Sequence, residues 1–364
     1  MDIILWSFPI FLVLVGIEAL SSRYDESKKY RLNDTLSNMS CGIFDQVVNA
    51  GIGTFVIGIY MYIYTKAAVF QMSPKNPLSW ILLLVGIDLA YYCFHRASHR
   101  INLLWGAHIV HHQSESYNMT VSLRQGTVAT WVGYIFYLPL AILGFSAPMF
   151  LIMNGLYQLY QFLVHTNLIK TLGPLESFIA TPELHRVHHS RDEKYLDKNY
   201  GGLFIFWDKM FKSFAPMKEA PQYGITTGVQ SWNPLWANIH YYVHLWKSSR
   251  AKKDWKTKLK IWFAAPADTR DIVLPVLSQN GYNSTIDRKH LVLAILQIAL
   301  TVSGAFFLLY KKGDLATLQY IFASLTVLLS LINVNGLFEK AKWIVKSQIL
   351  LFIFFLITLY FFLV

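Results

Sequence analysis

The sequence predicts an all-α integral membrane protein, with about eight transmembrane helices and a helical cytoplasmic cap that carries clustered histidines. Three observations lead to this fold class. Of the 364 residues, 54% are hydrophobic and 16% are aromatic, which is more apolar surface than one soluble core needs. The apolar residues are collected in runs about as long as a bilayer is thick. Nine of the twelve histidines fall between positions 95 and 189.

The predicted spans are runs of about 17 to 24 apolar residues, the length that a bilayer requires. They cover residues 3–20, 47–70, 78–94, 128–145, 148–164, 291–310, 315–333 and 345–364. Ala19 and Ser21 resemble the end of a signal peptide, but the residues before the first run include Asp2 and no basic residue. We therefore expect a retained helix rather than a cleaved signal.

The spans divide the chain into four regions. N-terminal transmembrane helices occupy residues 1–77, the clustered histidines lie in 78–215, and C-terminal transmembrane helices occupy 291–364. Between them, 216–290 is expected to be a cytoplasmic or interfacial amphipathic segment. Its stretch 232–263 mixes Trp and Tyr with seven Lys or Arg residues. This mixture favours a helix lying on anionic lipid, and a solvated basic helix is the alternative.

The charge distribution indicates topology rather than nucleic-acid binding. Lys and Arg outnumber Asp and Glu by 32 to 21, and the excess lies between the apolar runs instead of along one stripe. Arg23, Lys28, Lys29 and Arg31 crowd the first loop, which the positive-inside rule places in the cytoplasm. With eight spans, every clustered histidine then lies on the cytoplasmic side.

The clustered histidines are spaced as on the faces of helices. Eight of them form one H-x-x-x-H and two H-x-x-H-H patterns: His95 and His99; His108, His111 and His112; His185, His188 and His189. Residues three and four apart share a helical face, so we expect each cluster to present its imidazoles to one point, as chelation of a metal requires.

The number of imidazoles predicts two metal ions, because a zinc site takes only three or four protein ligands. With only two cysteines, Cys41 and Cys93, neither a disulfide framework nor a thiolate zinc site is available. Imidazole suits iron, copper and zinc alike, and oxygen chemistry at a lipid interface favours iron.

Other functions of histidine fit the pattern less well. A metal transporter should place its ligands at mid-span together with carboxylates, and a haem protein usually uses single histidines within helices. Here the clusters lie at or beyond the ends of spans. No H-E-x-x-H motif occurs, which argues against a metalloprotease. A non-catalytic or transport protein with a metal site stays open as an alternative.

Single residues extend the predicted site. His165 is either a further ligand or an interfacial histidine, whereas His240 and His244 fit an interfacial role. Asp88 lies two helical turns before His95 within an apolar span. It is a candidate catalytic residue, which could accept the free ring N–H of a ligand histidine, or it could bond to a neighbouring helix. After the second cluster, polar residues that could act in catalysis or bind a headgroup follow: Glu115, Tyr117, Asn118 and Arg124.

The histidine patterns, in this order, resemble the fatty acid hydroxylase and sterol desaturase superfamily over about Ser79 to Phe214. Within it, the runs GIDLAYYCFHRASH, LWGAHIVHHQSESYNMTVSLRQ and TPELHRVHHSRDEKYLDKNYGG look most like the alkylglycerol monooxygenase family. This resemblance makes 78–215 a fatty acid hydroxylase-type catalytic region. Its implied ligands are the eight patterned histidines, and His165 matches a histidine of that family as well.

The resemblance also implies a reaction. A di-iron enzyme of this kind hydroxylates the ether-linked carbon of an alkylglycerol with oxygen and tetrahydrobiopterin as electron donor, and the product collapses to a fatty aldehyde and glycerol or its derivative. The lipid headgroup is expected at the cytoplasmic rim, in the endoplasmic reticulum of a eukaryote or the inner membrane of a bacterium. Leu184, Arg100 and the run FKSF depart from the family pattern. A related oxidase of fatty acids, sterols, sphingolipids or carotenoids is therefore the alternative.

Overall fold

The computed structural model describes residues 3–22, 30–269 and 281–364, with side chains from residue 9 onward. Throughout this part of the chain the secondary structure is helical, apart from two isolated β-bridges that pair Ile179 with Phe204 and Ser190 with Tyr223. The predicted all-α class is confirmed. Arg23, Lys28 and Lys29 lie outside the described residues, as does part of the expected segment 216–290.

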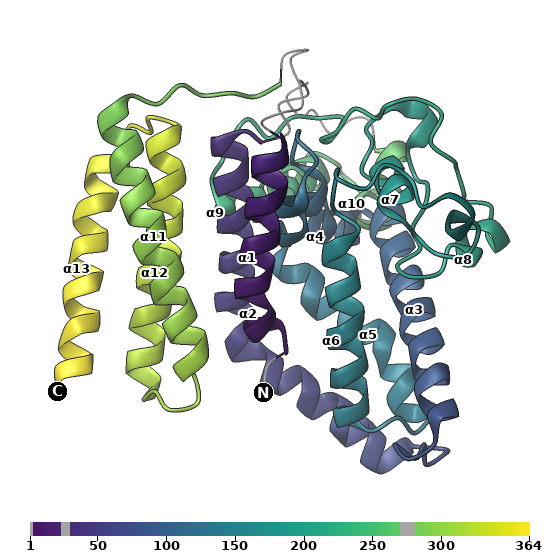
Figure 1. Ribbon diagram of the computed structural model, residues 1–364. Coiled ribbons are helices and arrows are strands. Elements are labelled where there is room, and N and C mark those ends of the chain that lie inside the picture. Colours follow the sequence, from purple (N-terminus) through teal and green to yellow (C-terminus); the bar gives the residue numbers. More distant parts are fainter. Residues whose placement is uncertain (1–2, 23–29, 270–280) are drawn as a thin grey trace.

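The long helices form two groups, and the helix axes of both groups are roughly aligned with one another (Figure 1). The first group contains α1 (Ile3–Ser21), α2 (Leu32–Ala67), α3 (Pro77–Arg100), α5 (Thr127–Ile142) and α6 (Ala147–Leu163). The second contains α11 (Arg288–Lys311), α12 (Thr317–Phe338) and α13 (Ile344–Leu363). Helix α2 joins the groups, because Phe44 and Val47 pack in one apolar core with Ile298 and Leu331.

Five of the described helices are long and apolar enough to cross a membrane, namely α2, α3, α11, α12 and α13. The described part of α1, Pro9–Ser21, and α5 are apolar but shorter. Helix α6 has 17 residues. The structure thus supports a multi-pass membrane protein with five candidate spans, whereas the expected count of eight stays a proposal.

Helix α2 differs most from its sequence prediction. It begins at Leu32 and runs for 36 residues, so the expected span 47–70 covers only its second half. At about 1.5 Å per residue the helix is about 54 Å long, well beyond the ~30 Å of a hydrocarbon layer. Its first half is polar yet buried, with Asp34 and Asn38 2% and 0% exposed. Protein contacts, rather than lipid, therefore surround this half.

Short helices gather at one end of the first group (Figure 1). They are α4 (Asn102–His112), η2 (Met119–Leu123), η3 (Gly173–Ser177), α7 (Pro182–His188), η4 (Glu193–Tyr195), α8 (Phe206–Met210), α9 (Pro234–Arg250), α10 (Trp255–Phe263) and η5 (Pro266–Asp268). The close packing of α4 depends on Gly126, where a Cβ atom would lie 2.0 Å from the Ala107 carbonyl oxygen. This end of the bundle brings α4 and α7 to the last turns of α3.

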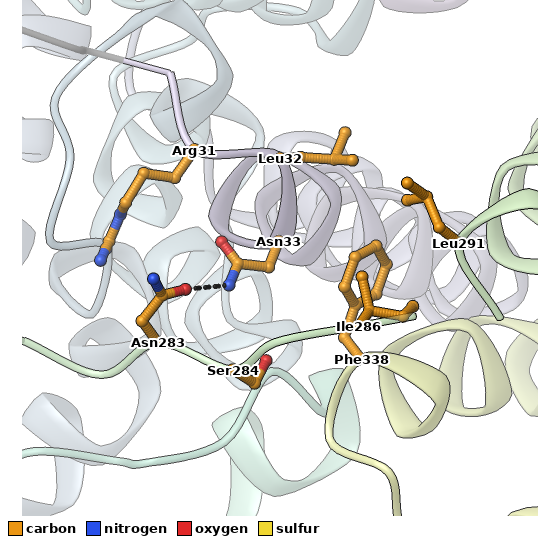
Figure 2. A pocket seen from close by; sticks show the side chains of 8 residues that line it. All are labelled: Arg31, Leu32, Asn33, Asn283, Ser284, Ile286, Leu291 and Phe338. Carbon is orange, nitrogen blue, oxygen red and sulfur yellow. Dashed lines mark hydrogen bonds between the residues drawn. The ribbon is translucent and has the colours of Figure 1, made fainter. Parts of the chain in front are cut away.

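A pocket of about 270 Å³ lies where α2 begins, at the boundary between the two helix groups (Figure 2). Its walls include Leu32, Leu291 and Phe338, and its polar side chains are paired within the protein. Asn33 donates to the Asn283 side chain at 2.8 Å. No histidine lines it, so it is separate from the clustered imidazoles.

Candidate metal centre

Four helices bring nine histidines into one buried site. His95 and His99 end α3, the second cluster ends α4, and the third lies on α7 and its C-cap. His165 follows α6 by two residues and is 3% exposed. The other ligand candidates are buried too, except His99, whose side chain is 9% exposed. The structure therefore joins His165 to the eight patterned histidines.

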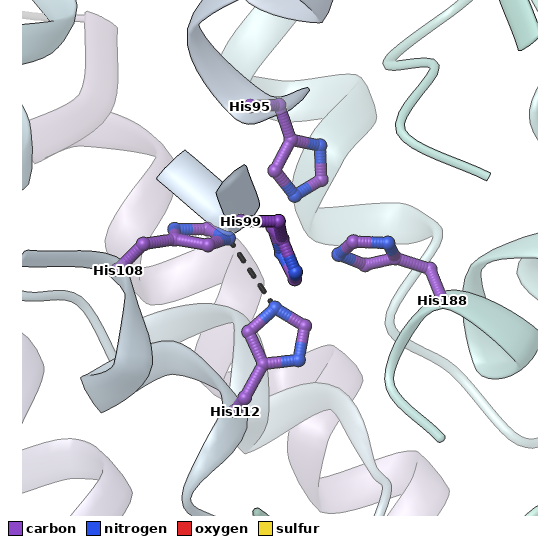
Figure 3. Close-up of side chains that lie close together, drawn as sticks. All are labelled: His95, His99, His108, His112 and His188. Atoms are coloured by element: carbon purple, nitrogen blue, oxygen red, sulfur yellow. Dashed lines mark hydrogen bonds between the residues drawn. The ribbon is translucent and has the colours of Figure 1, made fainter. Parts of the chain in front are cut away.

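The nine rings separate into two groups. The first is a group of five, in which each ring offers one nitrogen and all five nitrogens lie within 4.8 Å of one another: His95, His99, His108, His112 and His188. Figure 3 shows these five imidazoles pointing toward a common centre. The second is a group of four that meets the same distance limit: His111, His165, His185 and His189. The site thus offers two places for a metal ion, of five and four nitrogens.

Each H-x-x-H-H cluster contributes to both groups, so the expectation that one cluster serves one point is wrong. On α4, His108 and His112 face the first group while His111 faces the second. On α7 the arrangement is reversed, because His185 and the C-cap His189 face the second group. At about 100° per residue, positions i and i+4 differ by only about 40°, whereas i+3 points about 100° away from i+4.

Backbone carbonyls fix which ring nitrogen carries the proton. The Nδ1 atoms of His111 and His165 lie 3.0 Å and 2.6 Å from the carbonyl oxygens of Arg124 and Gln161. A carbonyl oxygen only accepts hydrogen bonds, so Nδ1 must donate and Nε2 of each neutral ring is left with a lone pair. These two Nε2 atoms face each other at 3.1 Å. Two acceptors cannot form a hydrogen bond, and a cation between them resolves the contact.

The separations between facing nitrogens also fit a metal. They are 3.0 Å for His165 and His185, 3.2 Å for His185 and His189, and 3.3 Å for His108 and His112. Nitrogens about 2.1 Å from one ion, at angles of about 90–109°, lie about 3.0–3.4 Å apart. In the first group, the Nε2 atoms of three rings are buried without any hydrogen-bond partner: His95, His99 and His188. The donor set is therefore complete for coordination and otherwise costly to bury.

Burial keeps the rings in the neutral form that binds metals. It lowers the pKa of His188 to about 4 and the pKa of His165 to about 3. For His112 and His189, burial and then the neighbouring imidazoles lower the pKa well below its usual range. Because protons do not compete at neutral pH, the site is prepared for a metal cation.

Asp88 does not contact the histidines as one of its sequence interpretations proposed. Its carboxylate accepts hydrogen bonds from the Tyr157 hydroxyl at 2.7 Å, from the backbone N–H of Leu203 at 2.7 Å, and from the Trp207 indole at 2.8 Å. Carbonyl oxygens take the ring N–H groups instead, as at His95, whose Nδ1 lies 2.8 Å from the Tyr200 oxygen. A carbonyl is present at every residue, so sequence reasoning could not single these acceptors out.

The polar residues after the second cluster are not placed at an open rim. Arg124 is 2% exposed and donates to the carbonyl oxygen of Val110 and to the Gln113 side chain. Glu115 accepts from Arg31 and from the Tyr282 backbone N–H. Arg124 also donates to Ser37 and Asn38 of the polar half of α2, and this packing of α2 over the segment explains why Arg124 is buried. Glu115 is only partly buried, with its side chain 13% exposed.

Asn118 and Tyr117 are buried as well. The Asn118 side chain accepts from the Thr120 backbone N–H at 3.0 Å and caps η2. Tyr117 stacks on the His165 ring, with ring centres 5.9 Å apart, and its hydroxyl donates to the Val164 carbonyl. The catalytic roles expected for Asp88, Glu115 and Asn118 stay predictions. His240 lies outside both histidine groups, with Nδ1 3.0 Å from the Ala237 oxygen.

Comparison with known proteins gives this site a family. Residues 80–213 match the fatty acid hydroxylase family. An alkylglycerol monooxygenase of Xenopus tropicalis is 35% identical over 258 residues, which cover 70% of this chain and 57% of that protein. The corresponding protein of Danio rerio is 31% identical over 342 residues, which cover 91% of this chain and 76% of that protein. The chain belongs to the alkylglycerol monooxygenase family.

This member of the alkylglycerol monooxygenase family spans little more than half the length of the Xenopus tropicalis relative. A more distant relative is an ornithine lipid hydroxylase of Rhizobium tropici, 28% identical over 61% of this chain and 72% of that protein. No solved structure matches the chain. The match to the fatty acid hydroxylase family contains all nine histidines of the two groups.

Proposed function

We propose that this chain is a membrane monooxygenase that holds two irons and hydroxylates the ether-linked carbon of alkylglycerol lipids. The observation that carries the proposal is the pair of neutral imidazole groups in a chain so similar to alkylglycerol monooxygenases. Imidazole is a good ligand for iron. When bound, iron supplies the activation of oxygen, and tetrahydrobiopterin supplies the electrons.

The proposed reaction balances as a monooxygenation. One oxygen atom enters a C–H bond of the ether-linked carbon, and the other leaves as water with two electrons and two protons from the reductant. The resulting hemiacetal breaks its C–O bond to give a fatty aldehyde and glycerol or a glycerol derivative. The protein's own contribution is to orient the histidine rings and to exclude water from the site, since eight of the nine rings are buried.

The membrane arrangement forms part of the proposal. Helices α1, α5 and α6 join the five longer candidates to make eight spans. This count is supported by the packing of α5 and α6 against α2 and α3, and of α1 against α6, in one bundle (Figure 1). The short helices then form a cytoplasmic cap, and the metal centre lies at that side. The alkyl chain enters between the spans, so the ether-linked carbon, first in the chain, comes nearest to the metals.

Three polar residues act by positioning other groups. Asp88 holds the backbone at Leu203, and Asn118 caps the turn after the second histidine cluster. Glu115 ties this turn to Arg31 at the start of α2. Each shapes the walls of the metal centre through hydrogen bonds within the protein.

The decisive test is product analysis with purified protein, a 1-O-alkylglycerol, oxygen and tetrahydrobiopterin. We expect a fatty aldehyde in amounts that depend on the lipid. His111→Ala should abolish its formation, whereas His240→Ala, which changes a buried histidine outside both groups, should retain it. Failure to form aldehyde with either tetrahydrobiopterin or a ferredoxin-type donor would overturn the assignment.

A second candidate is hydroxylation of another membrane lipid. It is favoured by the similarity to the ornithine lipid hydroxylase, which extends over 72% of that protein. The two functions differ in the carbon that reacts, because only attack on an ether-linked carbon releases an aldehyde. Hydroxylation of an acyl, sterol or sphingoid substrate without aldehyde would favour this candidate.

A further inference from the structure

A four-residue loop, 197–200, lies against the first histidine group. Its carbonyl oxygens accept two of the ring N–H groups that fix ligand orientation. The His95 Nδ1 atom is 2.8 Å from the Tyr200 oxygen, and the His188 Nδ1 atom is 2.9 Å from the Lys198 oxygen. One short loop thus sets the ring orientation of two ligands that come from different helices.

A third histidine of the first group, His99, lies close to a charged side chain of the same loop. The nearer Asp197 carboxylate oxygen is 3.8 Å from Nδ1 of His99, and the other oxygen accepts from Arg100 at 2.9 Å. At this distance the carboxylate acts on His99 electrostatically rather than through a hydrogen bond. A negative charge this close favours positive charge on the ring and so strengthens its donation to a metal cation. The second group has no such carboxylate among its described contacts.

The loop has an unusual backbone. Asp197 and Asn199 have φ angles of 60° and 54°, in the left-handed region that Asp and Asn tolerate better than other residues with side chains. Left-handed residues on both sides of Lys198 bend the chain around the histidine rings. Such a conformation persists only when the surrounding structure holds it.

Asp208 is the residue that holds the loop. It is fully buried, and its carboxylate accepts from the backbone N–H groups of Tyr200 at 2.8 Å and Gly201 at 2.6 Å. The Ser213 hydroxyl donates to it at 2.7 Å. A Cβ atom at Gly201 would lie 2.9 Å from the Asp208 carboxylate, so glycine allows this approach. The Asn199 side chain adds a bond to the Leu184 carbonyl at 3.1 Å.

We propose that Asp208 and the loop 197–200 form an orienting platform that sets the metal affinity of the five-histidine group without contacting the metal. Asp208 is a positioning residue, and Asp197 strengthens the donor at His99. The platform selectively affects one of the two metals. This inference rests on the proposed function only in requiring that both histidine groups bind metal.

The test measures metal content and metal release in the full-length chain purified in detergent and loaded with ferrous iron without oxygen. Asp208→Asn keeps the shape of the side chain but removes its charge and one acceptor. Changes of this kind around a site typically weaken metal binding about 10- to 100-fold. We expect one of the two metals to be released to a chelator about 10- to 100-fold faster, and the other at the wild-type rate.

Asp45→Asn is the matched control. Asp45 is 3% exposed and accepts hydrogen bonds from the Gln46 and Asn49 side chains. These partners belong to α2 and not to the loop 197–200. We expect wild-type release of both metals from this variant. Asp197→Asn, which tolerates the left-handed backbone, should accelerate release from the same metal as Asp208→Asn by a smaller factor.

Double variants assign the affected metal. In a His165→Ala background, which weakens the second group, Asp208→Asn should accelerate release of the remaining metal. In a His188→Ala background, which weakens the first group, it should leave release of the remaining metal unchanged. Release of both metals at the wild-type rate from Asp208→Asn and Asp197→Asn overturns the inference. Equal acceleration of both metals also overturns it, because it indicates a general effect on folding. Fewer than two metals in the wild type would instead overturn the proposed function.

Discussion

The substitution His165→Ala tests the metal centre most directly, because His165 belongs to no histidine motif in the sequence. Its Nε2 atom lies 3.1 Å from Nε2 of His111 and 3.0 Å from Nε2 of His185. Nδ1 donates to the Gln161 carbonyl at 2.6 Å, which fixes the ring plane. If the four-histidine group binds a metal, this ring is one of four ligands.

The expected loss follows from the number of ligands. A four-ligand structural zinc site binds its ion with about 10–16 kcal/mol, which is about 3–4 kcal/mol per ligand. At about 1.4 kcal/mol for each factor of ten, the removal of one ligand weakens binding by about 10²- to 10³-fold. The five-histidine group keeps all its ligands, so the variant should retain one firmly bound metal in place of two.

The assay is metal analysis after dialysis against a chelator of graded strength, followed by addition of imidazole. Free imidazole can occupy the space left by the missing side chain and should restore part of the second metal. His240→Ala is the control, because His240 is 2% exposed and bonds through Nδ1 to a backbone carbonyl in the same way. The interpretation is refuted if His165→Ala keeps both metals at wild-type affinity, or if His240→Ala loses one.

Three further predictions concern stability and the membrane surface. Asp88→Ala leaves buried donors unpaired, at about 1–3 kcal/mol each, and should lower the unfolding temperature in detergent; an unchanged temperature would contradict this. Burial lowers the pKa of His240 to about 4, below the 6.5 of an unfolded histidine, so the unfolded chain binds this proton first as the pH falls. The contribution of His240 to the free energy of unfolding is therefore full above about pH 6.5 and is lost as the pH falls toward 4. Between these pH values, the free energy of unfolding of His240→Gln should fall by up to about 3 kcal/mol less than that of the wild type, as measured by unfolding at a series of pH values. On α10, Leu259 is 48% exposed in a row with other apolar side chains. In a Cys93→Ser background, Leu259→Cys should react more slowly with a water-soluble maleimide in anionic vesicles than in detergent, whereas Lys253→Cys should react at similar rates in both. Equal rates for Leu259→Cys in vesicles and in detergent would contradict an interfacial helix.

The helical class and eight of the nine ligand candidates could be predicted because their patterns are local. The three- and four-residue spacings of His108, His111 and His112 are read directly on one helix. His165 left two interpretations open, since a single histidine at the end of an apolar run carries no spacing. The polar start of α2 was missed for a related reason, because residues such as Asn38 indicate a loop until their buried partners are known.

The sequence by itself determined that this is a helical membrane protein with clustered imidazoles, and it indicated two metals from their number alone. Only the tertiary structure decided how the rings are shared, because that depends on how α4 and α7 face each other across the end of α3. It also decided which groups orient the histidine rings. Backbone carbonyls such as that of Tyr200 do so, and they are identical at every position until the fold places them beside a ring. The physical reason is that the sequence states which side chains can bind a metal, whereas the grouping and orientation of the rings depend on where the fold places them in space.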